Sequence, residues 1–421
     1  MRVRNWAGNV SFSAARLCRP SSLDELRTLV AGSRRVRALG TGHSFNRIAD
    51  TTGDLISLAG LPPVIEVDSA NRLVEVSAGL RYGELAGELH RQGFALHNLG
   101  SLPHISVAGA CATATHGSGD QNATLAAAVA AVEMVTPDGE LRVLSRTGDT
   151  AAEFFGSVVG LGSLGITSRL WLDIEPAYSM RQHVYDNLGH DQVLEHLDQI
   201  LASAYSVSLF TGWQPDPVYQ VWRKRRVTAE DDGGAEPVFF GATAAPVARH
   251  PLPGMTGDNC TEQFGRIGPW HERLPHFRME FIPSRGEELQ SEYLVPRPLA
   301  GQAIQALARI SDRVAPVLQV CELRSIAADE FWLSPSYRRD SLGLHFTWIP
   351  DAAAVVPVLV EIERQLAPLE SRPHWAKLYT LQTPALRGLY DRYADFERLL
   401  ALRDPGRKFS NQFLEQCFTP R

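Results

Sequence analysis

The chain has few cysteines and lacks a long apolar run. Its five cysteines, Cys18, Cys111, Cys260, Cys321 and Cys417, are odd in number and scattered, with no C-x-x-C spacing. This pattern argues against a disulfide framework and a zinc site, and it favours a reducing compartment. The first residues lack the apolar centre of a signal peptide, and residues 125–135 are too short for a membrane span and carry Glu133. We therefore expect a cytoplasmic protein with no metal and no membrane partner.

Strong charge of one sign is also absent. The chain of 421 residues has 41 Lys and Arg against 47 Asp and Glu, which gives a formal net charge of −6. A balance this mild indicates no nucleic-acid partner. The one basic run, Arg223-Lys224-Arg225-Arg226, is interpreted as a solvated strand end.

Length and periodicity indicate two domains, since one ordinary core does not extend over 421 residues. Residues 1–175 are predicted to be α+β, with short β-rich segments at 36–39, 55–58, 73–77, 133–135, 142–144 and 169–174 and helical patterns at 23–31 and 82–92. Ser21, Ser22 and Asp24 are expected to cap the first helix, and Pro137-Asp138-Gly139 predicts a hairpin turn.

Residues 176–378 are predicted to form a second domain with longer strands and amphipathic helices at 299–314 and 352–366. Pro357 would be tolerable only near the first turn of the latter helix. A Pro/Gly-rich segment at 231–268 is interpreted as a surface loop or lid, and residues 379–421 are expected to fold back on the first domain.

Residues 160–165, GLGSLG, match the dinucleotide fingerprint G-x-G-x-x-G. The fingerprint requires a strand, the loop and then a helix. Here residues 154–159 look like the end of a helix and residues 166–174 like a strand, so the order is reversed. We reject a nicotinamide site of the Rossmann type.

Two glycine-spaced loops carry the strongest signal for a cofactor. Gly40-Thr41-Gly42-His43-Ser44 and His116-Gly117-Ser118-Gly119 could together hold a diphosphate through backbone N–H groups. His43 is not needed for that task, but an imidazole is a competent nucleophile toward an electrophilic carbon, which suggests a tethered flavin. The small residues at 106–117 would let backbone lie flat against a planar ligand. The alternative is an ordinary turn.

Three strand-like segments of the second domain carry polar residues two apart, which share a strand face. The pairs are Glu322 with Arg324 and His345 with Thr347, and Lys377 stands between Trp375 and Tyr379. We interpret this face as the polar wall of a cavity. The alternative is a solvent-exposed face with surface ion pairs. The nearby Trp332, Phe346, Trp348, His374 and Trp375 favour the cavity, because such rings suit the C–H faces of a sugar-like ligand.

The chemistry of these groups fits a polyol, whose hydroxyls both donate and accept hydrogen bonds. Glu322 can accept and Arg324 can donate in a fixed fork. Oxidation of a carbinol needs its proton removed or its alkoxide stabilised, and Lys377 or Arg324 with His345 nearby can do this. The hydride then requires an acceptor such as a flavin.

Several segments together resemble the vanillyl-alcohol oxidase superfamily of covalent FAD enzymes and, within it, the bacterial alditol (xylitol) oxidases. The segments are NWAGN (5–9), GTGHSFN (40–46), SLPHISVAG (101–109), THGSG (115–119), NCTEQFG (259–265) and GPWHERLPHFR (268–278). The likeness runs over nearly the whole chain, and the last two segments distinguish the subfamily.

The resemblance implies an α+β protein with a split FAD-binding domain and an α+β cap (substrate) domain. It implies a covalent bond from His43 to the flavin 8α-methyl carbon as the single linkage, because residues 98–109 offer no cysteine for a second. Ser101, Glu322, Arg324, His345, Thr347 and Lys377 match substrate-contacting positions. Ser101, Ser106, Gly109, Ala110, Ala112 and Ile166, together with the two loops that contain Gly40, Thr41, Gly42, Ser44, His116 and Gly117, fall among the expected FAD contacts.

Gly100 falls where family members keep a small residue beside the oxygen-reactive carbon of the flavin, which favours an oxidase. It is smaller than the alanine expected from close relatives. We therefore predict an oxidase that converts the terminal primary alcohol of linear alditols such as xylitol or sorbitol to an aldehyde and reduces O₂ to H₂O₂, acting as a monomer.

The alternatives are an aldonolactone oxidase of the same superfamily, a serine hydrolase using Ser118 or Ser101 with His116, and a flavin-binding protein without catalysis. No G-x-S-x-G elbow supports the hydrolase.

Overall fold

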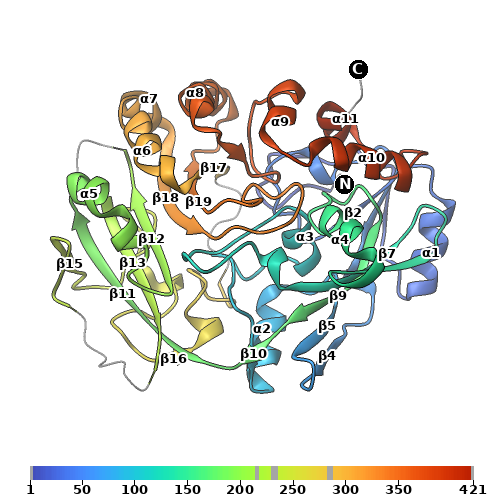
Figure 1. Ribbon diagram of the computed structural model, residues 1–421, viewed down its shortest axis with the longest axis horizontal. Helices are drawn as coiled ribbons and strands as arrows, with labels where there is room; N and C mark the ends of the chain where they lie inside the picture. The colour runs from blue at the N-terminus through green and yellow to red at the C-terminus, as the bar shows by residue number, and fades with distance from the viewer. Residues whose placement is uncertain (1–2, 214–217, 229–235, 282–287, 419–421) are drawn as a thin grey trace.

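Two β-rich parts lie side by side in the computed structural model, which describes residues 3–213, 218–228, 236–281 and 288–418 (Figure 1). The larger sheet has the strand order β14-β15-β11-β13-β12-β18-β19-β17-β20, with β16 paired to β11. Its strands are β11 (Ser179–Leu188), β12 (Ser206–Thr211), β13 (Val218–Arg226), β14 (Val238–Phe239), β15 (Ala242–Ala244), β16 (Gly268–Pro269), β17 (Leu289–Pro296), β18 (Leu318–Ile326), β19 (Ser341–Trp348) and β20 (Arg372–Pro373).

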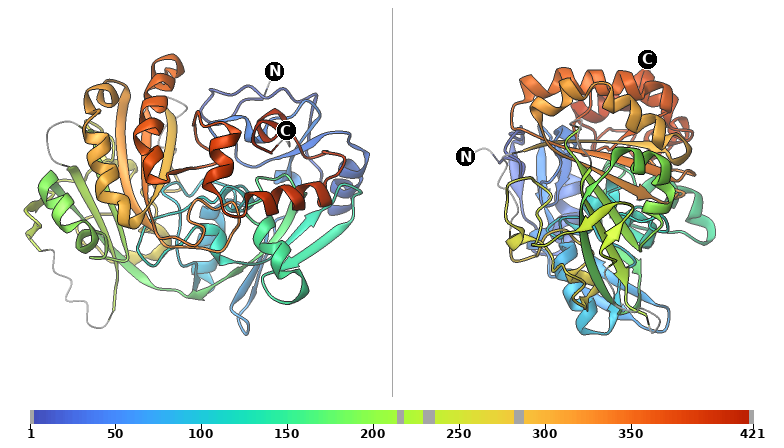
Figure 2. Two further views of the ribbon diagram at one scale, coloured as in Figure 1. Left: turned by 45° about the horizontal axis from the view of Figure 1, so that its top comes forward. Right: turned by 90° about the vertical axis from the view of Figure 1, so that its left-hand side faces the viewer.

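Helices cover one face of this sheet (Figure 2). They are α5 (His190–Leu201), α6 (Ala300–Ala308), α7 (Ser311–Val314) and α8 (Ala352–Leu366). Residues such as Leu197, Ile304 and Leu359 fill the core between these helices and the strands. These helices leave the opposite face of the large sheet uncovered.

The amino-terminal part holds a five-stranded antiparallel sheet in the order β4-β5-β9-β7-β8 and a parallel sheet in the order β1-β3-β2. The strands are β1 (Arg16–Cys18), β2 (Val36–Leu39), β3 (Asp54–Ser57), β4 (Ile65–Asp68), β5 (Leu73–Ser77), β7 (Val129–Val135), β8 (Leu141–Ser145) and β9 (Ile166–Asp173), and the pair β6 (Phe94–Ala95) and β10 (Glu175–Pro176) lies apart. The helices are α1 (Leu23–Gly32), α2 (Tyr82–Arg91), α3 (Val107–Ala112) and α4 (Ala151–Ser157).

The carboxyl-terminal helices α9 (Thr383–Leu389), α10 (Tyr393–Arg403) and α11 (Gln412–Phe418) pack beside the amino-terminal part (Figure 1). Phe396, Phe409 and Phe418 belong to the same apolar core as Val74 and Leu170 of that part. Chain ends far apart in the sequence thus complete one core. The boundaries at residues 175 and 378 stay predictions.

Local signals at the amino-terminal end agree with the structure. The Ser22 hydroxyl accepts from Glu25 N at 3.2 Å and caps α1. Thr136 N donates to Glu140 O at 2.9 Å across the expected hairpin turn, where Gly139 has φ of 85°. Residues 160–165 do lie between helix α4 and strand β9, which is the reversed order expected.

Four local expectations differ from the structure. The helix at 299–314 divides into α6 and α7, because Ile310 leaves the helical path (φ −113°, ψ 16°) and is buried in the core. Pro357 lies well inside α8. Of the expected loop or lid at 231–268, residues 231–235 lie outside the described ranges, and the rest contains β14, β15 and β16. The basic run does not end in solvent, since Arg223 is 7% and Lys224 0% exposed.

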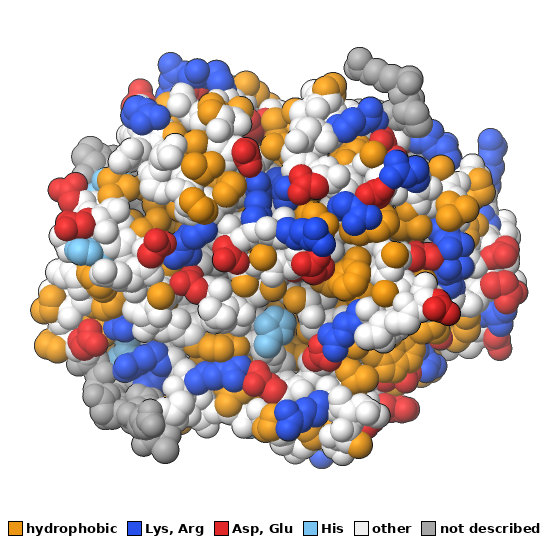
Figure 3. Space-filling view, in the orientation of Figure 1, with side chains coloured by type: hydrophobic (Ala, Val, Ile, Leu, Met, Phe, Trp, Pro, Cys, Tyr) orange, Lys and Arg blue, Asp and Glu red, His pale blue; other side chains and the backbone are white. Residues whose placement is uncertain are grey.

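The surface shows no large region of one charge on the face in Figure 3, where basic and acidic side chains are interspersed. Among the helices of the described ranges, none has the length and apolar content needed to cross a membrane. Within the same ranges, no group of three or more His, Cys, Asp or Glu side chains is arranged to hold a metal ion.

Candidate active site

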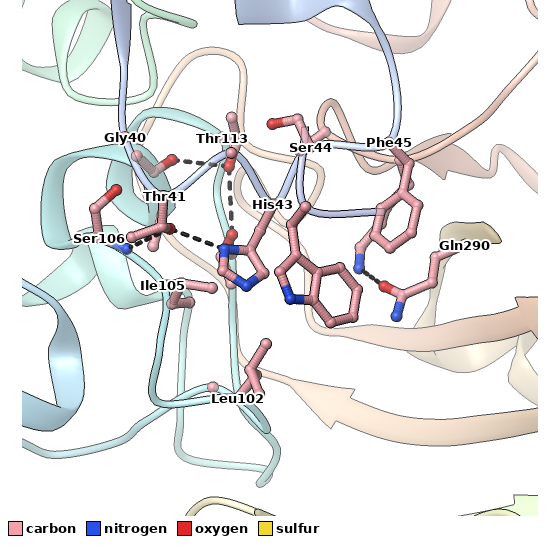
Figure 4. Close-up of a pocket in the computed structure, with 18 of the residues that line it drawn as sticks. Gly40, Thr41, His43, Ser44, Phe45, Leu102, Ile105, Ser106, Thr113 and Gln290 are labelled. Carbon is pink, nitrogen blue, oxygen red and sulfur yellow. Dashed lines mark hydrogen bonds between the residues drawn. The ribbon is translucent and has the colours of Figure 1, made fainter. Parts of the chain in front are cut away.

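A deep cavity separates the two parts of the molecule. One wall comes from residues 37–49, from the segment 100–116 that contains α3, and from the loop before β9. The other wall is the uncovered face of the large sheet. The part 250–252 of the expected lid, and His276 with Phe277, close a further side. Figure 4 shows the end of the cavity around His43.

Only one of the two ring nitrogens of His43 has a hydrogen-bond partner. Its Nδ1 lies 2.9 Å from Thr41 Oγ1, and the same oxygen accepts from Ser106 N at 3.2 Å (Figure 4). The ring stacks on Trp6 with centroids 5.1 Å apart. His43 Nε2 is buried and has no hydrogen-bond partner. Burial lowers the pKa of His43 to about 4, so the imidazole is neutral at pH 7 and able to act as a nucleophile.

The glycines beside His43 make room for close packing of backbone. A Cβ on Gly40 would stand 2.2 Å from Ser106 Oγ, and one on Gly109 would stand 2.7 Å from the same atom. Gly42 has φ of +75°, a conformation that side chains disfavour. The cavity lining beyond Ser106 consists of small residues, namely Ala108, Gly109, Ala110, Ala112, Thr113 and Thr115.

These features fit an FAD. A buried, unpartnered imidazole nitrogen and a lining of small residues suit a large planar ligand attached at one edge. Gly40, Thr41, Gly42, His43 and Ser44 all line the cavity, as does Ser101. The residues that would hold the cofactor are therefore those of the first loop and of the segment 100–113.

The second glycine loop differs from the expectation. Gly117, Ser118 and Gly119 do not line the cavity. A Cβ on Gly117 would stand 2.3 Å from Leu99 O, so this glycine serves packing against the chain itself, and Ser118 Oγ lies 2.5 Å from Ser206 Oγ. Ile166 is also absent from the lining, because its side chain is buried in the core while its neighbours Gly165 and Thr167 face the cavity.

The loop at 160–165, set aside as a nicotinamide fingerprint, nevertheless reaches the cavity through Leu161, Gly162 and Gly165. The Arg37 guanidinium holds it by donating to Leu161 O at 2.7 Å and Gly162 O at 2.6 Å. Sequence reasoning missed this contribution, because the motif was tested only against the wrong nucleotide-binding fold.

The polar wall forms as expected from strand alternation. Glu322 of β18 stands directly opposite His345 of β19, and Thr347 lies two residues further along the same face. All three line the cavity with Arg324, so the alternative of a solvent-exposed face is wrong. Arg324 Nη1 donates to Ser101 Oγ at 3.1 Å and ties this wall to the FAD-side loop.

Glu292 is the centre of the wall and was not identified from the sequence. It pairs with His345 across β17 and β19, and its carboxylate lies 2.7 Å from Arg324 Nη2, 3.3 Å from His345 Nδ1 and 3.2 Å from His116 Nε2. Burial acts to raise the pKa of Glu292, but His116, Arg324 and His345 hold it well below its usual range. The signal was present, since Gln290 and Glu292 stand two apart like the other polar pairs.

Glu322 is likewise ionised although it is 5% exposed. Burial acts to raise its pKa, but the charge of Arg324 and the hydrogen bond from His276 lower it below the ordinary value. Burial lowers the pKa of His345 below its usual value, against the opposing charge of Glu292. The wall thus offers a carboxylate, a guanidinium and a neutral imidazole to a ligand.

Lys377 does not lie on a strand, contrary to the expectation for 375–379. Residues 374–378 form a turn after β20, in which Lys377 N donates to His374 O at 3.0 Å. Asn46 Nδ2 donates to Lys377 O at 2.8 Å and anchors the turn to the His43 loop. The Lys377 ammonium donates to Gln290 Oε1. Burial lowers the pKa of Lys377 to about 8, with Glu292 acting in the opposite direction.

Most of the aromatic residues expected to contact a sugar-like ligand do not line the cavity. Phe346 and Trp348 are buried in the core under the helices, and Trp332 and Trp375 are buried in the core of the amino-terminal part. Only His374 of that set lines the cavity. Alternation explains the error, because Phe346 and Trp348 stand on the opposite face of β19 from His345 and Thr347.

Comparison with known proteins agrees with this geometry. Residues 14–145 match the FAD binding domain family, and residues 284–417 match the D-arabinono-1,4-lactone oxidase family. An alditol oxidase of Streptomyces sp. is 50% identical over 417 residues, 98% of each chain. The chain belongs to the alditol oxidase family. The predicted resemblance and the dependence on FAD are thereby confirmed, and the protein is an FAD-dependent oxidoreductase.

Two proteins of lower sequence identity are also similar. An L-gulono-1,4-lactone dehydrogenase of Mycobacterium tuberculosis is 27% identical over 99% of each chain. The crystal structure of a cholesterol oxidase from B. sterolicum matches with a TM-score of 0.81 over 99% of this chain and 96% of that one, at 13% identity. This likeness shows the fold and confirms the predicted α+β FAD-binding class for this alditol oxidase family member.

Proposed function

We propose that the protein oxidises the terminal primary alcohol of a linear alditol such as xylitol or sorbitol to the aldehyde, with O₂ as electron acceptor and H₂O₂ as product. The observation that carries the proposal is the buried polar wall, whose carboxylate, guanidinium, imidazole and amine face the same cavity as His43. The name of the Streptomyces relative supports the same substrate class. We place the protein in the cytoplasm as a monomer.

The FAD, when bound, supplies the acceptor for the hydride and the route of electrons to O₂. His43 would be the residue that holds it covalently, through the 8α-methyl carbon. Its Nδ1 is engaged by Thr41 Oγ1, so the unpartnered Nε2 is the nitrogen that would be available for the attachment. Gly100 lines the cavity beside Ser101, and its lack of a side chain would favour access of O₂ to the bound cofactor.

Lys377 and Arg324 stabilise the negative charge that develops on the substrate oxygen as the hydride leaves. Arg324 is buried and Lys377 is partly buried, and a charge acts more strongly in such a site than in water. His345, kept neutral by burial, assists removal of the hydroxyl proton.

The other hydroxyls of the alditol bind to Glu322, Ser101 and Thr347. Glu322 accepts hydrogen bonds, while the two hydroxyl side chains both donate and accept. An unmatched polar group in such a wall costs binding free energy, so ligands without hydroxyls at these positions bind weakly.

An aldonolactone oxidase is the second candidate. The match of residues 284–417 to the D-arabinono-1,4-lactone oxidase family favours it. The serine hydrolase finds no support, because Ser118 lies outside the cavity lining and Ser101 Oγ accepts from Arg324.

The experiment that tests the proposal is replacement of Lys377 by Met in the FAD-loaded enzyme. Loss of the buried cation should slow flavin reduction by xylitol at least about a hundredfold, the usual effect of one such group. Stopped-flow absorbance under anaerobic conditions measures this rate. Lys408→Met is the matched control, because Lys408 donates to Val30 O and Pro137 O outside the cavity. Near-normal reduction by the Lys377 variant would remove Lys377 from the mechanism.

A further inference from the structure

Lys224 is a buried cation that the proposed reaction does not use. It lies on β13 with 0% of its surface exposed, on the same sheet face as Arg324, because Ser206 pairs with Lys224 and Ser208 with Arg324. Its ammonium donates to Leu274 O at 2.6 Å and Pro275 O at 2.9 Å, and it lies 3.2 Å from His276 Nδ1. Three N–H donors thus meet three acceptors.

The third contact fixes the proton on His276. In its ammonium form, which the charge of Glu322 favours, Lys224 can only donate, so His276 Nδ1 accepts. Burial lowers the pKa of His276 to about 4, so the ring is neutral and carries its single proton on Nε2. That nitrogen lies 2.8 Å from Glu322 Oε1 and donates to it.

Backbone hydrogen bonds and neighbouring rings position the His276 side chain. Its backbone N donates to Ser101 O at 3.0 Å, and its carbonyl accepts from Thr261 N at 2.9 Å. The ring is enclosed by Phe210 and Trp222, with centroids 5.6 Å and 5.2 Å away. In this position the contact with Lys224 favours the tautomer of His276 that carries its proton on Nε2.

We propose that Lys224 is a positioning residue for substrate binding, which acts through His276 on Glu322. The hydrogen bond from His276 occupies Oε1 and leaves Oε2, 3.6 Å from Arg324 Nε, to accept from a hydroxyl of the ligand. With the proton on Nδ1 instead, the lone pair of Nε2 would face the carboxylate and repel it. This inference rests on the proposed function, in which Glu322 binds a hydroxyl that does not react.

The cost of burying Lys224 agrees with a specific role. Burial lowers its pKa to about 7, and the charge of Glu322 acts to raise it. A lysine whose only task was to fill space would be replaced by an apolar side chain at lower free energy. His276 lines the cavity and Lys224 does not, so Lys224 is a partner of His276 and not of the substrate.

Replacement of Lys224 by Met in the FAD-loaded enzyme tests the proposal. We expect KM for xylitol to rise about tenfold while kcat changes less than about threefold, because one charged hydrogen bond to a non-reacting hydroxyl is weakened. Arg223→Met is the matched control. Arg223 is the neighbouring buried cation, but it donates to Ser203 Oγ and O on the other face, so its loss should leave KM unchanged. Equal changes in both variants would overturn the proposal.

A double-mutant cycle separates the route of the effect. If Lys224 acts through His276, Lys224→Met should add little to KM in a His276→Gln background. Additive effects would contradict the proposal.

A measurement without substrate keeps the test independent of the proposed function. The ¹⁵N chemical shifts of labelled histidines in the full chain, with the His276 signals assigned by His276→Gln, report which ring nitrogen is protonated. We expect Nε2–H in the wild type and a shift toward Nδ1–H in Lys224→Met. Nδ1–H in the wild type would overturn the inference even where alditols are oxidised, and failure of every alditol to react would overturn the proposed function alone.

Discussion

At the scale of single residues, the site depends on ionised groups buried in mutual contact. Glu292 is 2% and Arg324 5% exposed, and neither charge would be stable there alone. Glu292 neutralises Arg324 and contacts His345, which are two of the three groups proposed to face the reacting hydroxyl. The wall is therefore rigid before the substrate arrives, which favours stabilisation of charge in the transition state.

The ionisation of Lys377 predicts how activity depends on pH. The proposed role requires the ammonium form, and burial lowers the pKa of Lys377 to about 8. The proton is held below that pH and lost above it, so kcat/KM for xylitol should fall as pH rises through about 8. In Lys377→Arg the cation persists at high pH, so this decline should disappear even if the overall rate is lower.

Steady-state kinetics between pH 6 and pH 10 check this expectation. The Lys408→Met enzyme should keep the wild-type profile. A decline near pH 8 of the same size in Lys377→Arg would show that another group titrates.

Sequence analysis placed single residues correctly where strand alternation applied. It failed for a residue whose burial depends on contacts distant in the sequence. Glu322, Arg324, His345 and Thr347 were placed on one face by their spacing, and they do face one cavity. Lys224 was assigned to solvent because a run of basic residues is usually exposed. No local pattern shows that its partners are two backbone carbonyls and the His276 ring, about fifty residues further along the chain.

At the scale of elements, α8 shows how tertiary packing overrides local preference. Val355, Leu359, Ile362 and Leu366 bury one stripe of this helix in the core, while Pro357 lies on the exposed side well beyond the first turn. The helix continues through the proline because the buried stripe holds it, although a hydrogen bond to Ala353 O is missing.

Replacement of Pro357 by Ala should therefore stabilise the protein. The restored backbone N–H can bond to Ala353 O, and we expect the free energy of unfolding to rise by about 1–2 kcal/mol after the greater freedom of the unfolded chain is considered. Thermal denaturation measures the change. Val360→Ala on the same exposed side, which alters only helix propensity, should change stability by less than about 0.6 kcal/mol. A lower midpoint for Pro357→Ala would contradict this account of α8.

Some element boundaries were predictable from periodicity and caps, but the break between α6 and α7 and the connections were not. Helix α8 matches its predicted bounds, whereas the turn at 374–378 was taken for a strand because Trp375, Lys377 and Tyr379 alternate. What positions that turn is distant in sequence, namely Asn46 and the backbone of Gln290, which accepts from Leu378 N at 2.8 Å.

At the scale of the whole molecule, the cavity exists because two cores meet at one face of the large sheet. The covered face carries helices, and the uncovered face meets the FAD-side loops (Figure 2). Sequence analysis indicated both halves and their likeness to known flavoproteins. It could not show that the second glycine loop turns away from the cavity, because that depends on the fit of Gly117 against Leu99.

The proposed attachment of FAD predicts a property of the unfolded chain. The wild-type protein should give a fluorescent band in a denaturing gel, and His43→Ala should not, because the attaching nitrogen is removed. The variant should still bind FAD without a covalent bond, so its melting temperature should rise with added FAD. His90→Ala, a histidine outside the cavity lining, should keep the fluorescent band. A fluorescent band from His43→Ala would show attachment elsewhere.

The most direct test of the central claim is the rate of H₂O₂ release by the FAD-loaded enzyme with alditols and with sugar 1,4-lactones at equal concentrations. A cavity wall built to bind a row of hydroxyls predicts rapid peroxide release with xylitol and sorbitol, one equivalent for each aldehyde formed, and little with the lactones. Peroxide release from the lactones but not from any alditol would contradict the account.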